Sequence, residues 1–432
     1  MIGVRSAIVA LSVLGLTASA GAHPRRPDAA ASVPAIVASP AFKSAMSAFE
    51  REHDRVVADT ITLTEIEAPP FKETRRAQAY LAMLKAHGLT DVEMDDIGNV
   101  MGIRRGTGPA GGKLVVIAAH LDTVFPEGTN VKVRREGTKL HAPGIGDDTY
   151  SLAVLLGYLR ALDAAKIRTE RDILFVGNVG EEGPGDLRGM RYFFGQGKYR
   201  DRVHAFFSMD GTEASRVTHG AVGSRRYRVT FKGPGGHSYG AFGIVNPMQA
   251  MAKAVVDFGA VQVPAKPRTT YAASVVGGGT SVNSIPDAIW LEVDMRSESR
   301  DELAKLDAKF LQIVKDAAEF ENRQRSTRLG RITVEPKLIG DRPAGQTPES
   351  AEIVRATAAA VKAAGYTPQL GASSTDSNVP ISLAIPAVTI GSGGSGARAH
   401  SVDEWIDVAK PEAVKGAAVG LASILAMAGV AR

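Results

Sequence analysis

The 432-residue chain contains no cysteine. This absence excludes disulfide bonds, thiolate metal ligands and a cysteine-linked lipid anchor. Neither sign of charge is in large excess, because 51 Lys and Arg residues face 46 Asp and Glu residues and give a formal net charge of +5. Basic residues gather only in short groups, as in residues 323–331, whereas a nucleic-acid-binding surface needs a broader basic stripe. We therefore expect no nucleic-acid partner.

Long apolar runs are scarce too. The apolar run of residues 7–16 follows Arg5 and precedes Ala20-Gly21-Ala22, a pattern typical of a secretory signal peptide cleaved after residue 22. The run is too short to span a bilayer, and no later segment is expected to do so. We predict a signal peptide over residues 1–22, a flexible Ala- and Pro-rich leader over residues 23–40, and a periplasmic or secreted location without a stable membrane anchor. An uncleaved N-terminal anchor is the alternative.

Strand-like and helix-like patterns alternate along most of the remaining chain. This alternation is typical of an α/β fold whose mixed sheet has helices on both faces. Between residues 218 and 337 the order changes to β-α-β-β-α-β, which is typical of a ferredoxin-like α+β module. We predict a larger domain made of residues 41–217 and 338–432, interrupted by an inserted domain at residues 218–337.

Acidic and imidazole side chains stand where the strands of the larger domain are expected to end. Ligands of open α/β sheets bind beside the carboxyl ends of the strands, so these side chains are candidates for one shared site. They are His120, Asp122, Asp147, Asp148, Glu181, Glu182, Asp210 and His400. Together they offer nitrogen and oxygen ligands for more than one divalent metal and leave a carboxylate to spare. The set therefore predicts metal-assisted hydrolysis.

Several of these residues also have a purely structural explanation. His120 can be a buried histidine with satisfied hydrogen bonds. Asp147 can bridge two metals, and Asp148 can instead cap the helix that follows. Adjacent acids such as Glu181 and Glu182 usually mark a solvated loop, but beside a metal one can bind it while the other acts as general base.

The motifs HLDTV, GIGDD, GEEG, GGHS and AHSVDE occur in this order, and a further acid follows a strand. The series resembles the dinuclear zinc metallopeptidases that include aminoacylase, carboxypeptidase G and peptidase T, over about residues 45–428. The resemblance implies the following roles. One metal is held by His120 and Asp210, the other by Glu182 and His400, with Asp147 bridging, Asp122 orienting His120 and Glu181 as general base.

The same resemblance implies two Zn²⁺ ions per chain, with Co²⁺ or Mn²⁺ possible at such nitrogen and oxygen ligands. It makes the larger domain catalytic and the inserted domain a lid or dimerisation domain. His237 of the inserted domain would help to hold the oxyanion, often across a dimer, so a homodimer is implied. Asn283 resembles a position that contacts substrate or the interface.

Two details bear on the activity. The family usually has Lys where this chain has Thr149, which alters the loop but removes no ligand. Residues 374–378, STDSN, resemble the pattern of peptidase T and favour a peptidase. We predict an exported metal-dependent exopeptidase of the aminopeptidase or di- and tripeptidase type. The alternative is an N-acyl or N-carbamoyl amino-acid amidohydrolase with the same dinuclear site.

A binding protein that has lost turnover is a third hypothesis. The presence of Glu181 argues against it, because binding alone needs no spare carboxylate beside the metals. The sequence assigns no partner for a substrate carboxylate, although Arg225, Arg226 and Arg296 are conceivable.

Overall fold

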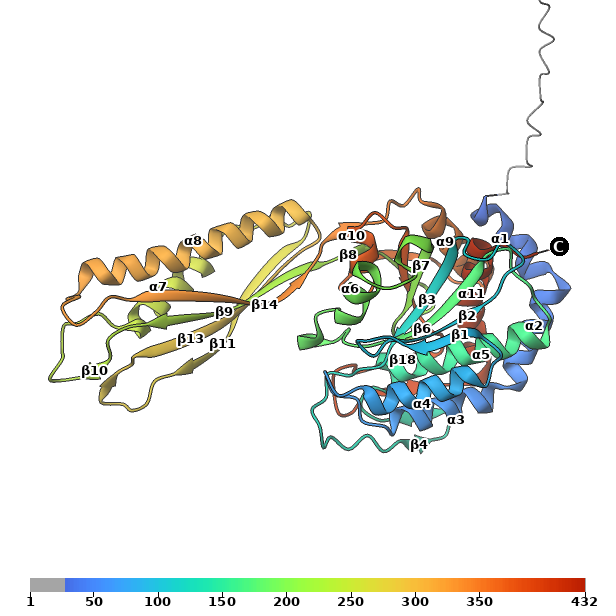
Figure 1. The fold of residues 1–432 in the computed structure, drawn as a ribbon, viewed down its shortest axis with the longest axis horizontal. Helices are drawn as coiled ribbons and strands as arrows, with labels where there is room; N and C mark the ends of the chain where they lie inside the picture. Colours follow the sequence, from blue (N-terminus) through green and yellow to red (C-terminus); the bar gives the residue numbers. More distant parts are fainter. Residues whose placement is uncertain (1–27, 432) are drawn as a thin grey trace, which may run out of the picture.

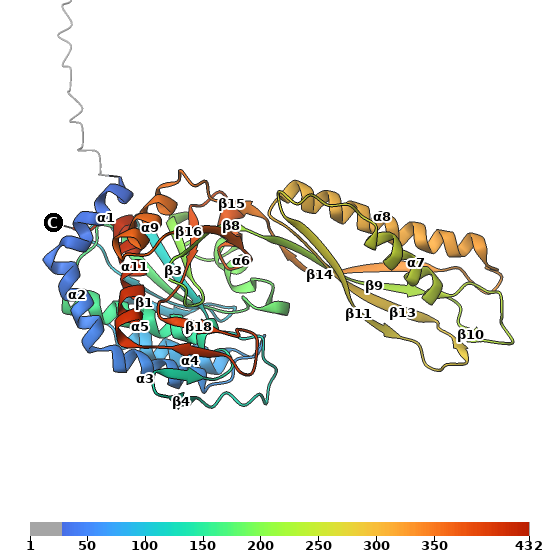
Figure 2. The same ribbon diagram turned by 180° about the vertical axis from the view of Figure 1, so that it is seen from behind.

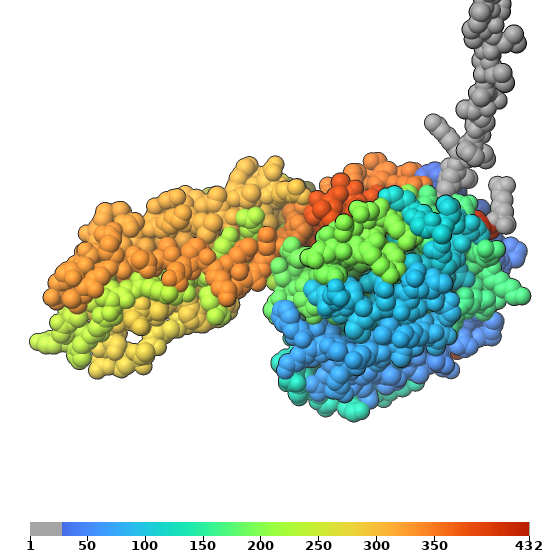
Figure 3. Space-filling view, in the orientation of Figure 1, coloured from blue at the N-terminus to red at the C-terminus, as the bar shows by residue number. Residues whose placement is uncertain are grey.

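The structure is a computed structural model that describes residues 28–431. The predicted signal peptide lies outside the described residues. The chain forms a larger α/β domain and an elongated inserted domain that extends from one side of it (Figure 1). The space-filling view shows that the molecule narrows where the two domains meet (Figure 3).

A nine-stranded mixed sheet forms the centre of the larger domain, in the order β1-β2-β6-β3-β7-β17-β8-β15 with β16 beside β8. Its strands are β1 (Thr90–Met94), β2 (Val100–Arg104), β3 (Leu114–His120), β6 (Asp172–Asn178), β7 (Val203–Met209), β8 (Arg216–Ala221), β15 (Gly345–Gln346), β16 (Gln369–Ser373) and β17 (Ala387–Ile390). The central strand β3 runs parallel to both neighbours, β6 and β7. The carboxyl ends of these three strands therefore lie side by side.

Helices cover both faces of this sheet, as predicted. Successive side chains of a strand point to opposite faces, so Val115 and Ile117 of β3 pack into one apolar cluster and Val116 and Ala118 into another. The first cluster lies under α1 (Ala29–Ala38), α2 (Pro40–Arg51), α3 (His53–Thr64), α4 (Thr74–Lys85), α5 (Tyr150–Ala164), α9 (Glu352–Ala363) and α11 (Lys410–Ala428). The second lies under α6 (Arg188–Gly195) and α10 (Asn378–Ser382). Burial on both faces explains why β3 is apolar throughout.

A helix replaces most of the flexible leader predicted for residues 23–40. Residues 29–38 form α1, which lies beside α9 and α11 (Figure 2). Its Val33 is fully buried. Asp28 at its start forms an ion pair with Arg355 of α9. The Ala-rich composition is a good helix former, and small side chains let the helix approach its neighbours closely. A helix of ten residues is marginally stable by itself in water, so the contacts with α9 and α11 stabilise α1.

The C-terminal helix α11 corrects a second expectation. It is long and apolar enough to cross a membrane, with a mean hydropathy of 1.3, whereas no later segment was expected to reach that length. In the structure 72% of its apolar window is buried inside the domain. Its apolar character therefore has an explanation in the core of the larger domain.

The inserted domain has the predicted β-α-β-β-α-β order. It consists of β9 (Gly223–Lys232), α7 (Pro247–Gly259), β11 (Thr269–Gly278), β13 (Ala288–Ser297), α8 (Arg300–Gln324) and β14 (Thr333–Arg342), with the short pair β10 (Gly236–His237) and β12 (Ser284–Ile285). Its antiparallel sheet has the order β11-β13-β9-β14, and α7 and α8 cover one face. Because β8 belongs to the central sheet, the chain enters and leaves this domain a few residues later than 218 and 337.

A small antiparallel sheet beside the central one had no counterpart in the sequence-based expectations. Its strands are β4 (Arg134–Glu136), β5 (Lys139–His141), β18 (Ser395–Ala397) and β19 (Trp405–Asp407). It joins the segment that carries Asp147 to the segment that carries His400. The small sheet thus brings two distant parts of the chain to one place.

Candidate active site

The candidate site lies at the carboxyl ends of the three central parallel strands. His120 ends β3, Glu181 and Glu182 follow β6, and Asp210 follows β7. Asp147 and Asp148 lie in the turn Ile145–Thr149 that leads into α5, and His400 lies in the loop between β18 and β19. The structure therefore brings together all eight side chains that the sequence singled out in the larger domain.

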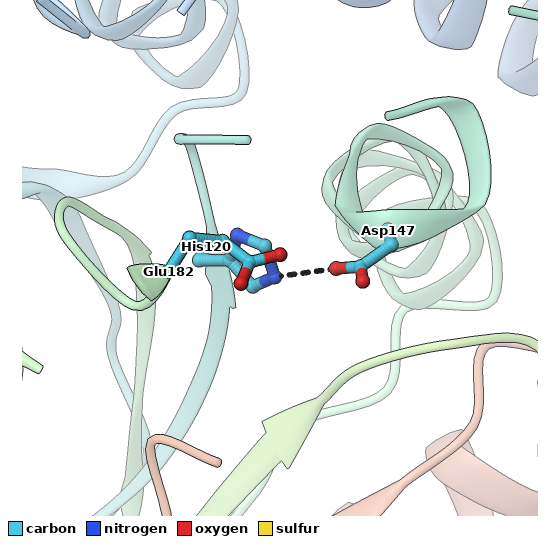
Figure 4. A group of neighbouring side chains, drawn as sticks. All are labelled: His120, Asp147 and Glu182. Atoms are coloured by element: carbon cyan, nitrogen blue, oxygen red, sulfur yellow. Dashed lines mark hydrogen bonds and ion pairs between the residues drawn. The ribbon is translucent and has the colours of Figure 1, made fainter. Parts of the chain in front are cut away.

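Asp147 is at the centre of this group. One of its carboxylate oxygens, Oδ1, lies 2.9 Å from Nε2 of His120, the contact marked in Figure 4. The other, Oδ2, lies 3.2 Å from Nε2 of His400. The same His400 nitrogen is 2.9 Å from Oε1 of Glu182. A carboxylate with an imidazole at each oxygen has the arrangement that a bridging ligand requires.

Two groups of side chains offer ligand atoms that all lie within 4.8 Å of one another. One consists of His120, Asp147 and Glu182, and the other of His120, Asp148 and Asp210. Asp210 thus lies near Asp148, which the sequence left open as a helix cap. In the structure Asp148 does not cap α5; its Oδ2 accepts a hydrogen bond of 3.0 Å from the backbone N–H of His120.

The electrostatics of the group call for bound cations. Burial, and then the charge of Asp147, raise the pKa of Asp210 well above its ordinary value. Burial likewise raises the pKa of Asp148. Although burial opposes it, the surrounding carboxylates raise the pKa of His120. Buried carboxylates this close together are stabilised as ligands of metal ions, and the carboxylate oxygens and histidine nitrogens of this group suit zinc.

Asp122 acts on the neighbouring loop as well as on His120. Its carboxylate accepts hydrogen bonds from the backbone N–H groups of Glu181, at 3.0 Å, and Glu182, at 2.8 Å. The contact to Nδ1 of His120 is made by the backbone carbonyl of Asp122 at 3.0 Å, while the nearer carboxylate oxygen is 3.7 Å away. Asp122 thus orients His120 through its backbone carbonyl, and its carboxylate holds the backbone of the two glutamates.

Glu181 is held by a residue that the sequence did not single out. Nη1 of Arg342, at the end of β14, donates to Oε1 of Glu181 at 3.0 Å, and both side chains are buried. Nη2 of the same guanidinium donates to the backbone carbonyl of Glu181. Burial raises the pKa of Glu181, and Arg342 opposes this rise. The sequence signal for this role was weak: an arginine directly before Pro343, five residues after the predicted end of the inserted domain at residue 337.

Glu404 shapes the turn that carries Asp147 and was also missed. Its buried carboxylate accepts hydrogen bonds from the backbone N–H groups of Gly144 at 2.7 Å, Gly146 at 2.8 Å and Asp147 at 2.9 Å. Thr149, in place of the family lysine, ties the same turn to α3 through a 2.6 Å contact between its hydroxyl and that of Thr64. The AHSVDE motif thus provides His400 and also the support for Asp147.

His237 and Asn283 are not part of this group. They lie next to each other, because β10 pairs with β12, but Figure 1 shows β10 at the end of the inserted domain that is remote from the larger domain. The backbone carbonyl of Asn283 accepts a hydrogen bond from Ser238 at 2.9 Å, and its side chain accepts one from Ser281 at 2.6 Å. Within one protomer neither residue reaches the cluster around Asp147.

A family model for peptidase family M20/M25/M40 matches residues 116–426, which include every residue of this group. The chain belongs to that family. The family's name and the candidate metal ligands both point to metal-dependent hydrolysis.

Individual relatives of this M20-family chain show how far the likeness extends. Carboxypeptidase G2 of a Pseudomonas species is 27% identical over 46% of the chain and 47% of its own length. The chain spans only 32% to 47% of the length of the curated relatives it matches. Aminopeptidase PepT of Bacillus cereus has a TM-score of 0.70 at 22% identity, covering 87% of this chain and 99% of its own. A hydantoinase/carbamoylase family amidase of Burkholderia ambifaria has a TM-score of 0.58 at 20% identity, covering 89% and 97%. These likenesses confirm the fold.

The site of this M20-family chain opens into a cleft of about 700 Å³ between the two domains. Asp147, Glu181 and His400 line it from the larger domain, and Arg226 and Arg296 from the inserted domain. Arg225, the third candidate for a substrate carboxylate, instead forms ion pairs with Asp307 and Asp341. The cleft therefore has a metal-binding wall and a basic wall.

Proposed function

We propose that the protein is an exported, metal-dependent exopeptidase that hydrolyses small peptides. The observation that carries this proposal is the buried Glu181, a carboxylate next to the candidate ligand Glu182 that faces the same cleft as Asp147 and His400. The strand-end acids give a ligand set for two metals and leave Glu181 for proton transfer. Family membership and the fold shared with PepT support a peptidase.

The proposed metal ligands are His120 and Asp210 for one ion, Glu182 and His400 for the other, and Asp147 for both. Two Zn²⁺ ions fit these donors, and Co²⁺ or Mn²⁺ are possible. Bound there, the cations would polarise the scissile carbonyl and acidify the attacking water.

Glu181 would take the proton from the attacking water and return it to the leaving amine. Two features of the chain prepare it for this task. Asp122 fixes the backbone of Glu181 and Glu182, and Arg342 holds the carboxylate in one orientation from the opposite side. Burial raises its pKa, which moves the base toward the pH range in which proton transfer is most efficient.

Hydrolysis assays with matched variants test this proposal. We expect native protein to cleave di- and tripeptides, metal analysis to find about two ions per chain, and Glu181→Gln to lose about 10²- to 10⁴-fold in kcat. Glu349→Gln removes an exposed carboxylate and serves as the control. Full activity of Glu181→Gln would disprove the role of this base, and failure to bind metal would disprove the whole scheme.

We further propose a homodimer in which His237 and Asn283 of one subunit complete the cleft of the other. Their distance from the cluster within one protomer supports this arrangement, because His237 can assist the reaction only from a second copy. Mixing two inactive variants tests it. A dimer of one Glu181→Gln subunit and one His237→Ala subunit contains one complete site, so mixing should restore activity. No recovery in a mixture shown by mass measurement to contain mixed dimers would refute the proposal.

The alternative function is hydrolysis of N-acyl or N-carbamoyl amino acids at the same site. The fold shared with a hydantoinase/carbamoylase family amidase supports it. Comparing kcat/KM for dipeptides with that for N-acetyl and N-carbamoyl amino acids of the same side chain separates the two activities. Export is tested by fractionating cells that produce the full chain, where removal of residues 1–22 is expected in the exported fraction.

A further inference from the structure

The cleft continues past the metal-binding wall into a second hollow of about 410 Å³. Gly183 and Arg226 line both cavities, so the two share an edge. Gly183 directly follows the candidate ligand Glu182, and Arg226 extends toward its backbone carbonyl, at 3.4 Å. The second hollow therefore begins at the residue that follows Glu182, and it extends from there along the inserted domain.

The floor of the second hollow is the open face of the inserted sheet. Tyr227 and Val229 of β9 pack into the apolar core beneath α7 and α8. Since side chains alternate along a strand, Arg226 and Arg228 point to the opposite face. Arg228 lies opposite Lys337 of the neighbouring strand β14 in the pairing register, so this residue also lies on the open face.

Positive charge exceeds negative charge on this face. Arg226 and Arg296 share a single carboxylate, that of Asp294, at 3.1 and 2.7 Å. Arg228 binds Glu292 through two nitrogens, at 2.8 and 2.5 Å, and stacks 4.2 Å from the ring centre of Trp290. Lys232 and Glu335 form a further ion pair on the same face, at 2.7 Å, so five cations, with Lys337, face three carboxylates.

Lys337 is a cation of this face that forms no ion pair with the other described residues. Among residues 28–431, no hydrogen bond or ion pair involves its exposed ammonium group. Pro184 and Ile339 supply apolar walls to the same hollow. A side chain with a few methylene groups and a terminal carboxylate matches these walls and this surplus charge.

We propose that the second hollow is a subsite for a carboxylate on the part of the substrate remote from the scissile bond. The protein would then prefer small peptides that contain an acidic residue over peptides with the uncharged amide in its place. This inference rests on the proposed function, whose cleft it extends. Arg226 lines the passage between the two cavities, and Arg228 and Lys337 bind the carboxylate of the substrate.

Binding of paired peptides to the Glu181→Gln protein tests the inference without turnover. Calorimetry compares Ala-Ala-Glu with Ala-Ala-Gln, and Glu-Ala-Ala with Gln-Ala-Ala. In at least one pair the acidic peptide should bind about fivefold more tightly, which is the discrimination expected of a partly exposed ion pair. The preference should also shrink as salt is raised, because salt screens exposed charges.

Substitutions then locate the preference. In the Glu181→Gln background, Lys337→Met should abolish it and Lys337→Glu should reverse it, while affinity for the neutral peptides stays within about twofold, since these make no ion pair there. Lys309→Met removes an exposed lysine of α8 and should leave the preference intact. Equal affinity within both peptide pairs, or a preference that survives Lys337→Glu, would overturn the inference. Failure of the proposed function would instead appear as no turnover of Ala-Ala-Ala by the native enzyme.

Discussion

Replacing Arg76 by Met should weaken both the fold and the metal site. Arg76 lies on α4 and is fully buried. Its guanidinium donates to the backbone carbonyl of Leu121 at 2.7 Å and to that of Ile66 at 2.6 and 3.0 Å. Burial lowers its pKa to about 10, opposed by the charges of Asp122 and Glu73, so it remains charged at neutral pH. The carbonyl of Leu121 lies between the candidate ligand His120 and Asp122.

The structure gives the size of the expected effect. Met fills a similar volume but donates to neither carbonyl, and it removes a positive charge that interacts with Asp122 and Glu73. A hydrogen bond from a charged group contributes about 1.5–3 kcal/mol, so losing the bonds to both carbonyls should cost about 3–6 kcal/mol of unfolding free energy. Arg76→Lys keeps the charge but cannot reach both carbonyls, and losing one such bond costs about 1.5–3 kcal/mol. Loosening the support of His120 should also lower metal affinity about 10- to 100-fold.

Urea unfolding of the metal-free proteins measures the first effect, and competition with a chromogenic chelator measures the second. Arg75→Met is the matched control, because Arg75 is the exposed neighbour on the same helix. The expected order of stability is Arg75→Met, then Arg76→Lys, then Arg76→Met. If Arg76→Met unfolds at the same urea concentration as Arg75→Met and binds metal equally well, the buried guanidinium does not support the site.

Three further predictions concern the turn that carries Asp147, the core and the metals. Glu404→Gln turns an amide N–H group toward backbone donors such as Gly144, and should cost about 1–3 kcal/mol in thermal or urea unfolding. Gly157→Ala places a methyl group 2.6 Å from the Phe49 ring, and should cost about 1–3 kcal/mol in urea unfolding. Removing metal leaves the charge of carboxylates such as Asp210 uncompensated, so chelation should lower the melting temperature. Adding Zn²⁺ should raise it again, because binding at a hundred times the Kd stabilises the folded state by about 2.7 kcal/mol.

Each of these three predictions has a result that would contradict it. For Glu404→Gln it is a native melting curve together with native metal affinity. For Gly157→Ala it is an unchanged urea midpoint, which would show that the Phe49 ring can move aside freely. For the metals it is a melting temperature that stays the same after chelation and after addition of Zn²⁺.

Local patterns predicted the elements with the strongest signals. The run of residues 114–119 is apolar throughout because β3 is buried on both faces. The β-α-β-β-α-β order of the inserted domain was readable because its strands alternate between a buried and an open face. Other elements gave no such signal. The three-residue strands β4, β5, β18 and β19 are too short for any periodicity.

The candidate site was predictable where residues follow strands and unpredictable where support arrives from elsewhere. Glu181 and Asp210 follow strong strand patterns, and parallel strands place their carboxyl ends at one edge. Arg76 and Arg342 gave no comparable signal, because an arginine on a helix or after a strand usually faces solvent. Their roles depend on which carbonyl or carboxylate the fold brings within reach.

The sequence by itself determined the kind of fold and the kind of chemistry, because strand and helix periodicity and the identities of His120, Asp147 and Glu182 are local properties. Tertiary structure decided how these residues are held and what surrounds them. It placed Glu404 under the turn of Asp147 and Arg342 against Glu181, and it removed His237 from the site of its own protomer. Hydrogen bonds and ion pairs of this kind join residues far apart in the chain, and local sequence patterns carry no record of them.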